Sequence, residues 1–231
     1  MSNHRQIASL FDDWATSGKA DGLEESHGDV ARQVLGQIEI RAGMQSLDLG
    51  CGTGWAARIL AAAAPGAGAV GVDVAPAMIR RAEELHDLTS RARYEVGTFE
   101  ELHFPDGRFD RVFSMEALYY AVDLDASLAE MLRVLKPGGT ADVVIDRYAE
   151  SIHTEGWAEQ VGLEMNFSSE AEWAASFERA GFGKVRTSRV IDSRGPGDEA
   201  DFTPGAHFPD YASQVELHAA GSLWIHAEKP G

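Results

Sequence analysis

The chain has 231 residues, a formal net charge of −17 at pH 7 and one cysteine, Cys51. This length predicts one α/β domain with a full hydrophobic core, and a lone cysteine excludes an intrachain disulfide. The negative charge argues against a nucleic-acid partner, because binding phosphates requires a basic surface. No apolar run approaches about 18 residues and no signal-peptide pattern opens the sequence, so we expect a cytoplasmic protein without membrane insertion.

Helices and strands are predicted to alternate along the chain, as is typical of a doubly wound parallel sheet. Residues 3–18 predict an amphipathic helix, because apolar side chains recur there at positions i, i+3, i+4 and i+7, and a second helix is expected over 27–40. The apolar runs that follow predict strands over 44–49, 68–73, 92–96, 110–115, 140–146, 184–191 and 222–228. The helices expected between these strands span 54–64, 76–86, 125–135, 169–181 and 210–219.

A glycine-rich loop follows the first predicted strand. Within residues 47–54, Gly50, Gly52 and Gly54 occupy every second position. Glycine has no Cβ, so it permits positive φ and a close approach of the backbone to a ligand. Asp73 ends the next strand about twenty residues later, where an acid typically binds the ribose hydroxyls of a nucleotide. The sequence therefore predicts a site for an adenosine-containing molecule, although Asp73 could instead cap the helix that follows it.

The spacing of the glycines distinguishes between nucleotide-binding families. A dinucleotide fingerprint, G-x-G-x-x-G, would place its third small residue at position 55, where this chain has Trp55. The G-x-G-x-G form instead resembles motif I of the class I S-adenosylmethionine-dependent methyltransferases. Further segments resemble later motifs of this family, in the same order along the chain: 72–78, 104–114 and 132–139. The resemblance spans roughly residues 44–146.

This resemblance implies a seven-stranded, mostly parallel sheet whose last strand runs antiparallel. It also implies a division of the single domain into an N-terminal helical cap (1–41), a cofactor-binding core (42–146) and a substrate-side insertion with a C-terminal hairpin (147–231). Residues 11–27 resemble the N-terminal cap of ubiquinone-biosynthesis-type C-methylating relatives, in which the cap covers the pocket.

The resemblance further implies that the cofactor is S-adenosyl-L-methionine. The acid of the first strand would lie near its amino group, the glycines under its methionine part and ribose, and Asp73 would accept both ribose hydroxyls. Many relatives carry an acid for the adenine amino group where this chain has Thr98, a weaker, neutral acceptor. The residues expected to bind the cofactor are Asp48, Gly50, Cys51, Gly52, Gly54, Asp73, Val74, Met78, Thr98, Phe99 and Ser114.

The residues after the fourth strand indicate the kind of acceptor. Residues 114–120 lack the Asn/Asp-Pro-Pro-Tyr/Phe signature of enzymes that methylate nucleic-acid amino groups, which, with the negative charge, favours a small-molecule substrate. Tyr119 and Tyr120 could line the path of the methyl group, since aromatic faces attract a sulfonium, or could simply pack within a helix.

A general base is needed only if the acceptor must lose a proton. The candidates are His27, Glu116, His153 and His207, and His27 is preferred because it belongs to the segment that resembles the family's cap. We expect no metal, because no Cys/His cluster has ligand spacing. Two alternatives stay open: a catalytically silent cofactor-binding module that acts through partners and, less favoured, a nicotinamide-dependent oxidoreductase.

Overall fold

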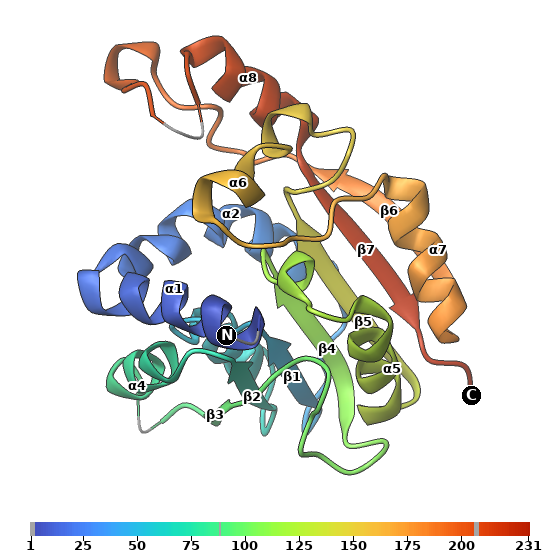
Figure 1. Ribbon diagram of the computed structural model, residues 1–231. Coiled ribbons are helices and arrows are strands. Elements are labelled where there is room, and N and C mark those ends of the chain that lie inside the picture. Colours follow the sequence, from blue (N-terminus) through green and yellow to red (C-terminus); the bar gives the residue numbers. More distant parts are fainter. Residues whose placement is uncertain (1–2, 88, 206–207) are drawn as a thin grey trace.

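Seven strands form one sheet at the centre of the computed structural model, which describes residues 3–87, 89–205 and 208–231 (Figure 1). The strand order is β3-β2-β1-β4-β5-β7-β6. Strands β1 to β5 run parallel to one another, and β7 is antiparallel to both β5 and β6. The strands are β1 Gln45–Leu49, β2 Gly68–Asp73, β3 Ala92–Val96, β4 Phe109–Met115, β5 Leu135–Ile145, β6 Gly183–Val190 and β7 Ser222–Glu228. The predicted mostly parallel sheet with an antiparallel last strand is confirmed.

Helices cover both faces of this sheet (Figure 1). The helices are α1 Asn3–Ser17, α2 Leu23–Leu35, α3 Trp55–Ala62, α4 Pro76–Glu84, α5 Leu124–Val134, α6 Trp157–Val161, α7 Glu170–Ala180 and α8 Tyr211–Ala220. Two buried apolar clusters form the core. One joins α5 and α7 to the sheet through residues such as Leu128 and Trp173, and the other joins α2 and α3 to it through Val34 and Leu60. Burial on both faces explains why the strands are nearly continuous apolar runs.

Two of the predicted elements, α2 and β5, have a boundary that differs by more than two residues from the prediction. Helix α2 covers Leu23–Leu35 instead of 27–40, because a short 3-10 helix, Lys19–Gly22, leads into it and Gly36 follows its last residue. Strand β5 begins at Leu135 instead of 140, because the turn before it also pairs: Gly138 donates to the carbonyl of Lys229, and Lys229 donates to that of Gly139. A proline-glycine turn therefore does not interrupt the strand.

The first helix is fastened to the fourth. Asp12 Oδ1 of α1 accepts a hydrogen bond of 2.6 Å from the backbone N–H of Ala77, near the start of α4. Arg81 of α4 pairs with Asp21 at 2.9 Å. In Figure 1, α1 lies beside α4 at the end of the sheet where the parallel strands finish, and α6 and α8 lie beyond that same end. These four helices therefore enclose the edge at which ligands bind in open α/β sheets.

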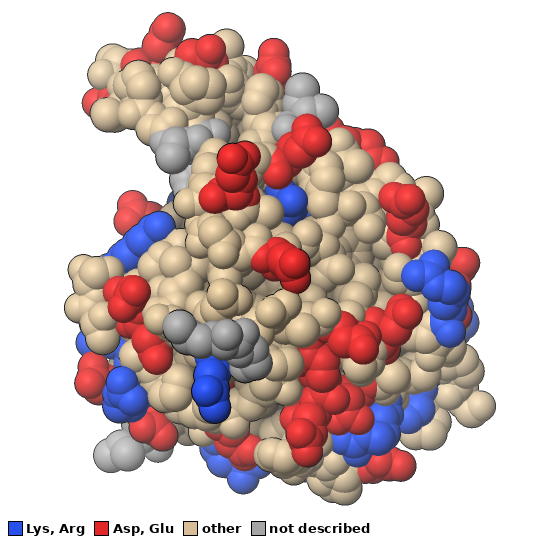
Figure 2. All heavy atoms as spheres, in the orientation of Figure 1, with Lys and Arg blue, Asp and Glu red and all other residues tan. Residues whose placement is uncertain are grey.

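Acidic side chains dominate the surface. Figure 2 shows Asp and Glu spread over one face, with Lys and Arg interspersed among them and no continuous basic patch on that face. Among the described helices, none combines the length and the apolar character needed to cross a bilayer.

A buried carboxylate joins the last strand to the rest of the sheet. Asp142 of β5 is fully buried and lies opposite His226 of β7. Its Oδ1 accepts hydrogen bonds from Trp224 Nε1 at 3.0 Å and from the His226 ring at 2.7 Å, and its Oδ2 accepts one from the hydroxyl of Thr140 at 3.2 Å. A buried carboxylate with several donors holds its neighbours in one arrangement.

Replacing Asp142 with alanine should therefore lower the free energy of unfolding by about 2–4 kcal/mol, because the buried donors of Trp224 and His226 lose their acceptor. Urea denaturation followed by circular dichroism measures this change. The control is Asp106→Ala, which removes an exposed ion pair with Arg133 and should change stability by less than about 1 kcal/mol. Equal effects of the two substitutions would contradict the role of Asp142.

Candidate active site

A cavity of about 430 Å³ lies beyond the carboxyl ends of β1, β2 and β4. Strands β1 and β4 are neighbours in the sheet, and the chain continues from them in opposite directions, to β2 and to β5. This is the switch point at which ligands bind in such sheets. The cavity wall includes residues from α1, the glycine loop, the end of β4, α6 and α8.

The glycine loop forms the floor of the cavity. Gly50, Gly52 and Gly54 all have positive φ, of 73°, 50° and 77°. A Cβ on Gly50 would lie only 2.2 Å from the Cβ of Ala117, so no larger residue fits there. A Cβ on Gly52 would meet nothing closer than Leu23, at 4.0 Å, so the backbone at Gly52 borders open space that a ligand could fill.

Asp73 fastens this loop to the end of β2. Its Oδ2 accepts a hydrogen bond of 2.9 Å from the N–H of Gly52, and its Oδ1 accepts one of 2.9 Å from Ala75. Burial raises the pKa of the Asp73 carboxyl to about 6. Asp73 does not act as the side-chain cap of α4: the N-cap residue is Ala75, and Asp12 of α1 instead accepts from Ala77. The alternative that Asp73 is a helix cap is therefore wrong.

Asp48 lies beside this loop with an unused hydrogen-bonding atom. The residue is only 1% exposed, it lines the cavity, and its Oδ2 has no hydrogen-bond partner in the described part of the chain. Burial, with a smaller effect from the Asp73 charge, raises the pKa of the Asp48 carboxyl to about 7. A desolvated acceptor of this kind fits the ammonium group of the expected cofactor, which would supply both a donor and a positive charge.

The first helix supplies a wall of the cavity, as the resemblance of residues 11–27 to a cap implied, although no motif named the side chains that would form it. Phe11 and Trp14 of α1 line the cavity together with Val74, Met78 and Phe99. The rings of Phe11 and Trp14 meet edge to face, with centroids 5.2 Å apart. The spacing of these side chains in α1 predicted only an apolar stripe, because periodicity reports burial and does not report whether the partner is protein or ligand.

Two predicted cofactor residues do not line the cavity. A Cβ on Gly54 would lie 2.4 Å from the Tyr94 ring, so Gly54 serves the packing of α3. Ser114 is fully buried, and its hydroxyl donates to the carbonyl of Leu49 at 2.8 Å, which ties β4 to β1. The other predicted residues line it: Asp48, Gly50, Cys51, Gly52, Asp73, Val74, Met78, Thr98 and Phe99.

Cys51 is buried, and its surroundings disfavour the reactive thiolate. It is 4% exposed, and burial together with Asp73 and Asp48 raises the pKa of its thiol well above the usual value. A thiol held in its protonated form is a poor nucleophile. Its environment therefore matches the expectation of a small side chain beside the ligand.

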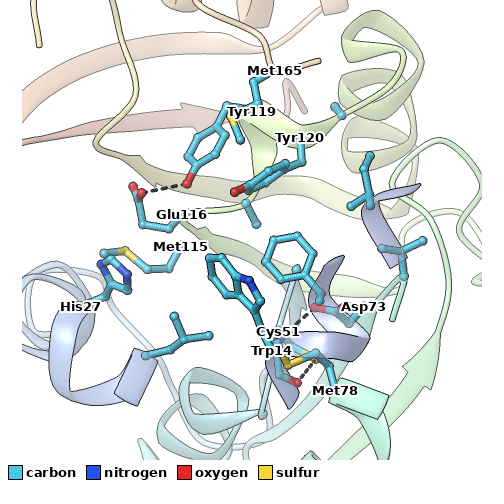
Figure 3. A pocket seen from close by; sticks show the side chains of 18 of the residues that line it. Trp14, His27, Cys51, Asp73, Met78, Met115, Glu116, Tyr119, Tyr120 and Met165 are labelled. Atoms are coloured by element: carbon cyan, nitrogen blue, oxygen red, sulfur yellow. Dashed lines mark hydrogen bonds between the residues drawn. The ribbon is translucent and has the colours of Figure 1, made fainter. Parts of the chain in front are cut away.

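The opposite end of the cavity holds the candidate catalytic groups. Figure 3 shows Glu116, Tyr119 and His27 at one end and Asp73 and Met78 at the other. Glu116 Oε2 accepts a hydrogen bond of 3.0 Å from the Tyr119 hydroxyl, and its Oε1 accepts one from the backbone N–H of Asp146. Glu116 has a φ of 53°, unusual for a residue other than glycine, so its surroundings hold the carboxyl in place at some cost.

The environment of this end shifts the titration of each group. Desolvation, reinforced by the charge of Asp146, raises the pKa of Glu116 well above its usual range. Burial raises the pKa of the hydroxyls of Tyr119 and Tyr120, so both remain neutral. Desolvation lowers the pKa of His27, which favours the neutral imidazole.

The other two candidate bases are not brought into this group. His153 pairs with Glu216 at 2.7 Å and does not line the cavity, and His207 lies outside the described residues. The cavity wall beyond Glu116 comes mostly from residues 147–231, which were expected on the substrate side, but no motif singled out its individual residues. Its members are Asp146, Trp157, Val161, Met165, Phe208 and Leu217.

Comparison with known proteins identifies the family. A family described as a methyltransferase domain matches residues 47–142. The chain is 32% identical, with a TM-score of 0.88, to the methyltransferase solved in complex with the Haloferax volcanii Trm112 methyltransferase activator. This match covers 96% of the present chain and 98% of the chain in that structure. The present chain is also 32% identical over 168 residues to a sterol 24-C-methyltransferase of Aspergillus fumigatus, covering 68% of this chain. The chain spans 44% of the length of that curated relative.

A more distant solved structure shares the fold and carries the product of the cofactor. This is a Haemonchus contortus phosphoethanolamine N-methyltransferase in complex with S-adenosylhomocysteine, with a TM-score of 0.68 and 22% identity over 87% of this chain and 52% of that one. The glycine loop, the acids of β1 and β2, and the near full-length match to a methyltransferase agree with one another. The chain belongs to the class I S-adenosylmethionine-dependent methyltransferase family.

Proposed function

We propose that the chain transfers a methyl group from S-adenosylmethionine to a small-molecule acceptor. The observation that supports this most directly is one cavity with two chemically different ends. Asp48 and Asp73 stand at the end formed by the glycine loop, and Glu116 and Tyr119 stand at the other. A ligand that spans the first end would present its reactive group toward the second.

The cofactor would be held by carboxyl groups that can accept further hydrogen bonds. Asp73 already accepts two backbone hydrogen bonds, and a carboxylate has about four acceptor sites, so both ribose hydroxyls can still donate to it. Asp48 Oδ2 would accept from the ammonium group. Phe11 and Phe99 would flank the adenine. Bound there, the cofactor supplies an electrophilic methyl group on a sulfonium.

The residues of the chain itself would align the acceptor and exclude water, the two contributions that an in-line displacement needs most. The cap, residues 1–41, would close the cavity from one side through α1. Residues 147–231 would close it from the other, since α6 and α8 supply Trp157, Val161 and Leu217 to its wall. Glu116 would hold or remove a proton of the acceptor.

Binding of S-adenosylhomocysteine tests the cofactor site. Asp73→Ala should weaken this binding at least tenfold, or about 1.4 kcal/mol, because the ribose loses a charge-assisted acceptor. Isothermal titration calorimetry measures the change. The matched control is Glu83→Ala on the exposed side of α4, which should leave the affinity unchanged. Absence of binding to the unaltered protein at millimolar ligand would contradict the proposed function itself.

Turnover of labelled cofactor against a panel of metabolites is a second experiment, and it separates an enzyme from a catalytically silent cofactor-binding module.

The affinity should also depend on pH. In the ligand-free protein the pKa is about 7 for Asp48 and about 6 for Asp73, and the ligand requires both carboxylates ionised. Below these values protons compete with the ligand, so the affinity should fall as pH is lowered, at least tenfold between about pH 8 and pH 5.5. Calorimetry across this range measures it, with Asp48→Asn as the control that should make the profile shallower and leave only the part due to Asp73. A flat profile for the unaltered protein would be inconsistent with both assignments.

A second proposal concerns a protein partner. We propose that the edge of the sheet at β3 binds an activator related to Trm112. The relative that aligns with almost the whole chain was solved in complex with such an activator. Among the described strands, β3 pairs with β2 alone, and Val96 at its end is 51% exposed. An open strand edge beside an exposed apolar side chain is suited to pairing with a strand of another protein.

Haloferax volcanii Trm112 should co-elute with this chain in size-exclusion chromatography. Val96→Asp should abolish co-elution, because it places a charge where an apolar contact is needed. Ile191→Asp alters a similarly exposed apolar residue after β6, on the opposite edge of the sheet, and should leave the complex intact. Loss of the complex in both variants, or in neither, would refute an interface at β3.

A further inference from the structure

We propose that the acceptor is a small apolar amine, bound as its ammonium by Glu116, and that Glu116 removes a proton from it before methyl transfer. This inference rests on the proposed function and names the substrate class of the same cavity. It is supported by the charge and the lining residues of the cavity end that contains Glu116.

At the acceptor end the charged side chains of the described cavity wall are acidic, and Arg147 acts on the Tyr119 and Tyr120 hydroxyls from outside the wall. Glu116 and Asp146 both line it. Within the described wall, the only Lys or Arg is Lys19, and its ammonium lies over the Trp14 ring, 3.6 Å from the ring centroid. Arg147 follows Asp146 in the chain but does not line the cavity, because its guanidinium donates to the carbonyls of residues 154 and 155. An anionic acceptor would therefore find repulsion without a compensating cation in the described wall.

Glu116 is arranged to respond to a cation. Both of its carboxyl oxygens accept hydrogen bonds, from Tyr119 and from Asp146, which fixes the direction of the group. Burial and the charge of Asp146 raise the pKa of Glu116, so a cation bound beside it favours the ionised carboxylate. An alkylammonium, with a pKa near that of lysine at about 10.4, is charged near neutral pH. Its binding would displace a proton held by Glu116 and leave an ion pair inside the cavity.

Aromatic rings complete a setting suited to positive charge. Tyr119 and Tyr120 line the cavity with their ring centroids 4.6 Å apart, and both hydroxyls stay neutral. Aromatic faces attract ammonium groups. Farther along the wall, Trp157, Met165 and Phe208 are apolar. The body of the acceptor is therefore apolar, and a single cationic group faces Glu116.

The positive charge that develops on the acceptor nitrogen during methyl transfer also favours an amine acceptor. When a neutral amine attacks the sulfonium methyl group, positive charge moves from sulfur to nitrogen. Glu116 holds the transferred proton at this point, so the carboxylate of Asp146 in the same wall stabilises this change. A phenolate or carbanion acceptor would instead bring a negative charge beside Glu116 and Asp146, and both carboxyl groups would destabilise it.

The reaction balances with the cofactor and the acceptor alone. The ammonium gives one proton to the Glu116 carboxylate. The nitrogen lone pair forms an N–C bond with the methyl group, and the S–C bond breaks with its electron pair kept by sulfur. The products are an N-methylammonium, neutral S-adenosylhomocysteine and one proton, which Glu116 releases to water.

Calorimetry on protein saturated with S-adenosylhomocysteine tests this inference with three ligands of matched size: phenethylamine, 2-phenylethanol and 3-phenylpropionate. Phenethylamine should bind at least tenfold more tightly than the alcohol, and the acid should bind most weakly. Titrations in buffers of different ionisation enthalpy, repeated between about pH 5 and pH 8, should show proton release on amine binding at pH values where Glu116 is protonated in the free protein, because Glu116 must ionise.

The outcomes separate this inference from the proposed function. If S-adenosylhomocysteine itself does not bind, the proposed function fails. If it binds, and phenethylamine binds no better than the alcohol or the acid, or releases no proton, the amine class is overturned while the function stands.

Substitution of Glu116 gives an independent readout. In Glu116→Gln the amide oxygen can still accept from Asp146 N–H and the NH2 group can donate to the Tyr119 oxygen, but the side chain cannot ionise. The preference for amine over alcohol should therefore fall at least tenfold, and proton release should disappear. Binding of S-adenosylhomocysteine reports whether this variant is folded. Glu178→Gln, an exposed residue of α7, should keep both the preference and the proton release. Tyr119→Phe retains the carboxyl and should also keep the preference. An unchanged preference in folded Glu116→Gln would overturn the proposal.

Discussion

The desolvation of three carboxyl groups around one cavity is the constraint on which the rest of the site depends. Asp48, Asp73 and Glu116 each have a raised pKa because the protein shields them from water. Such groups destabilise a folded chain unless other interactions offset the cost. Here backbone N–H groups offset part of it at Asp73 and Glu116, and the two apolar clusters of the core supply the remainder. A ligand that carries positive charge or several donors offsets this penalty, so the desolvation of the carboxyl groups favours such a ligand.

The residues of the glycine-loop end lie mostly within the segment that matches the family, whereas part of the acceptor end lies outside that segment. The matching family segment, residues 47–142, contains the glycine loop, Asp73 and Glu116. The segments that enclose the acceptor end, α6 and α8, lie outside it. Loops and added helices can differ between proteins that share a sheet, so one fold can present different acceptor walls beside the same kind of glycine loop.

Local sequence patterns predicted the sheet and the cofactor end well, because each depends on residues that are close in sequence. Apolar runs predicted all seven strands, and the glycine spacing with Asp73 predicted the floor of the cavity. The patterns did not predict Asp12 at the start of α4, Asp146 beside Glu116, or Trp14 in the cavity wall. Each of these depends on contacts between segments far apart in the chain, which no periodicity reports. Gly54 and Ser114 belong to matched motifs but serve packing, because a motif is also shaped by the core beneath the ligand.

The position of β7 between β5 and β6 has a consequence for the order in which the protein can be assembled during synthesis. In the described sheet, β6 pairs with β7 alone. The ribosome completes β6 before β7, so β6 has no neighbour to join when it emerges. Parallel strands β1 to β5 can form their ladder first, and β7 must then reach β5, with Asp142 receiving Trp224 and His226, before β6 gains a place. A nascent chain that stops before β7 therefore exposes two strand edges, and during this interval the chain depends on its high negative charge, or on chaperones, to remain unaggregated.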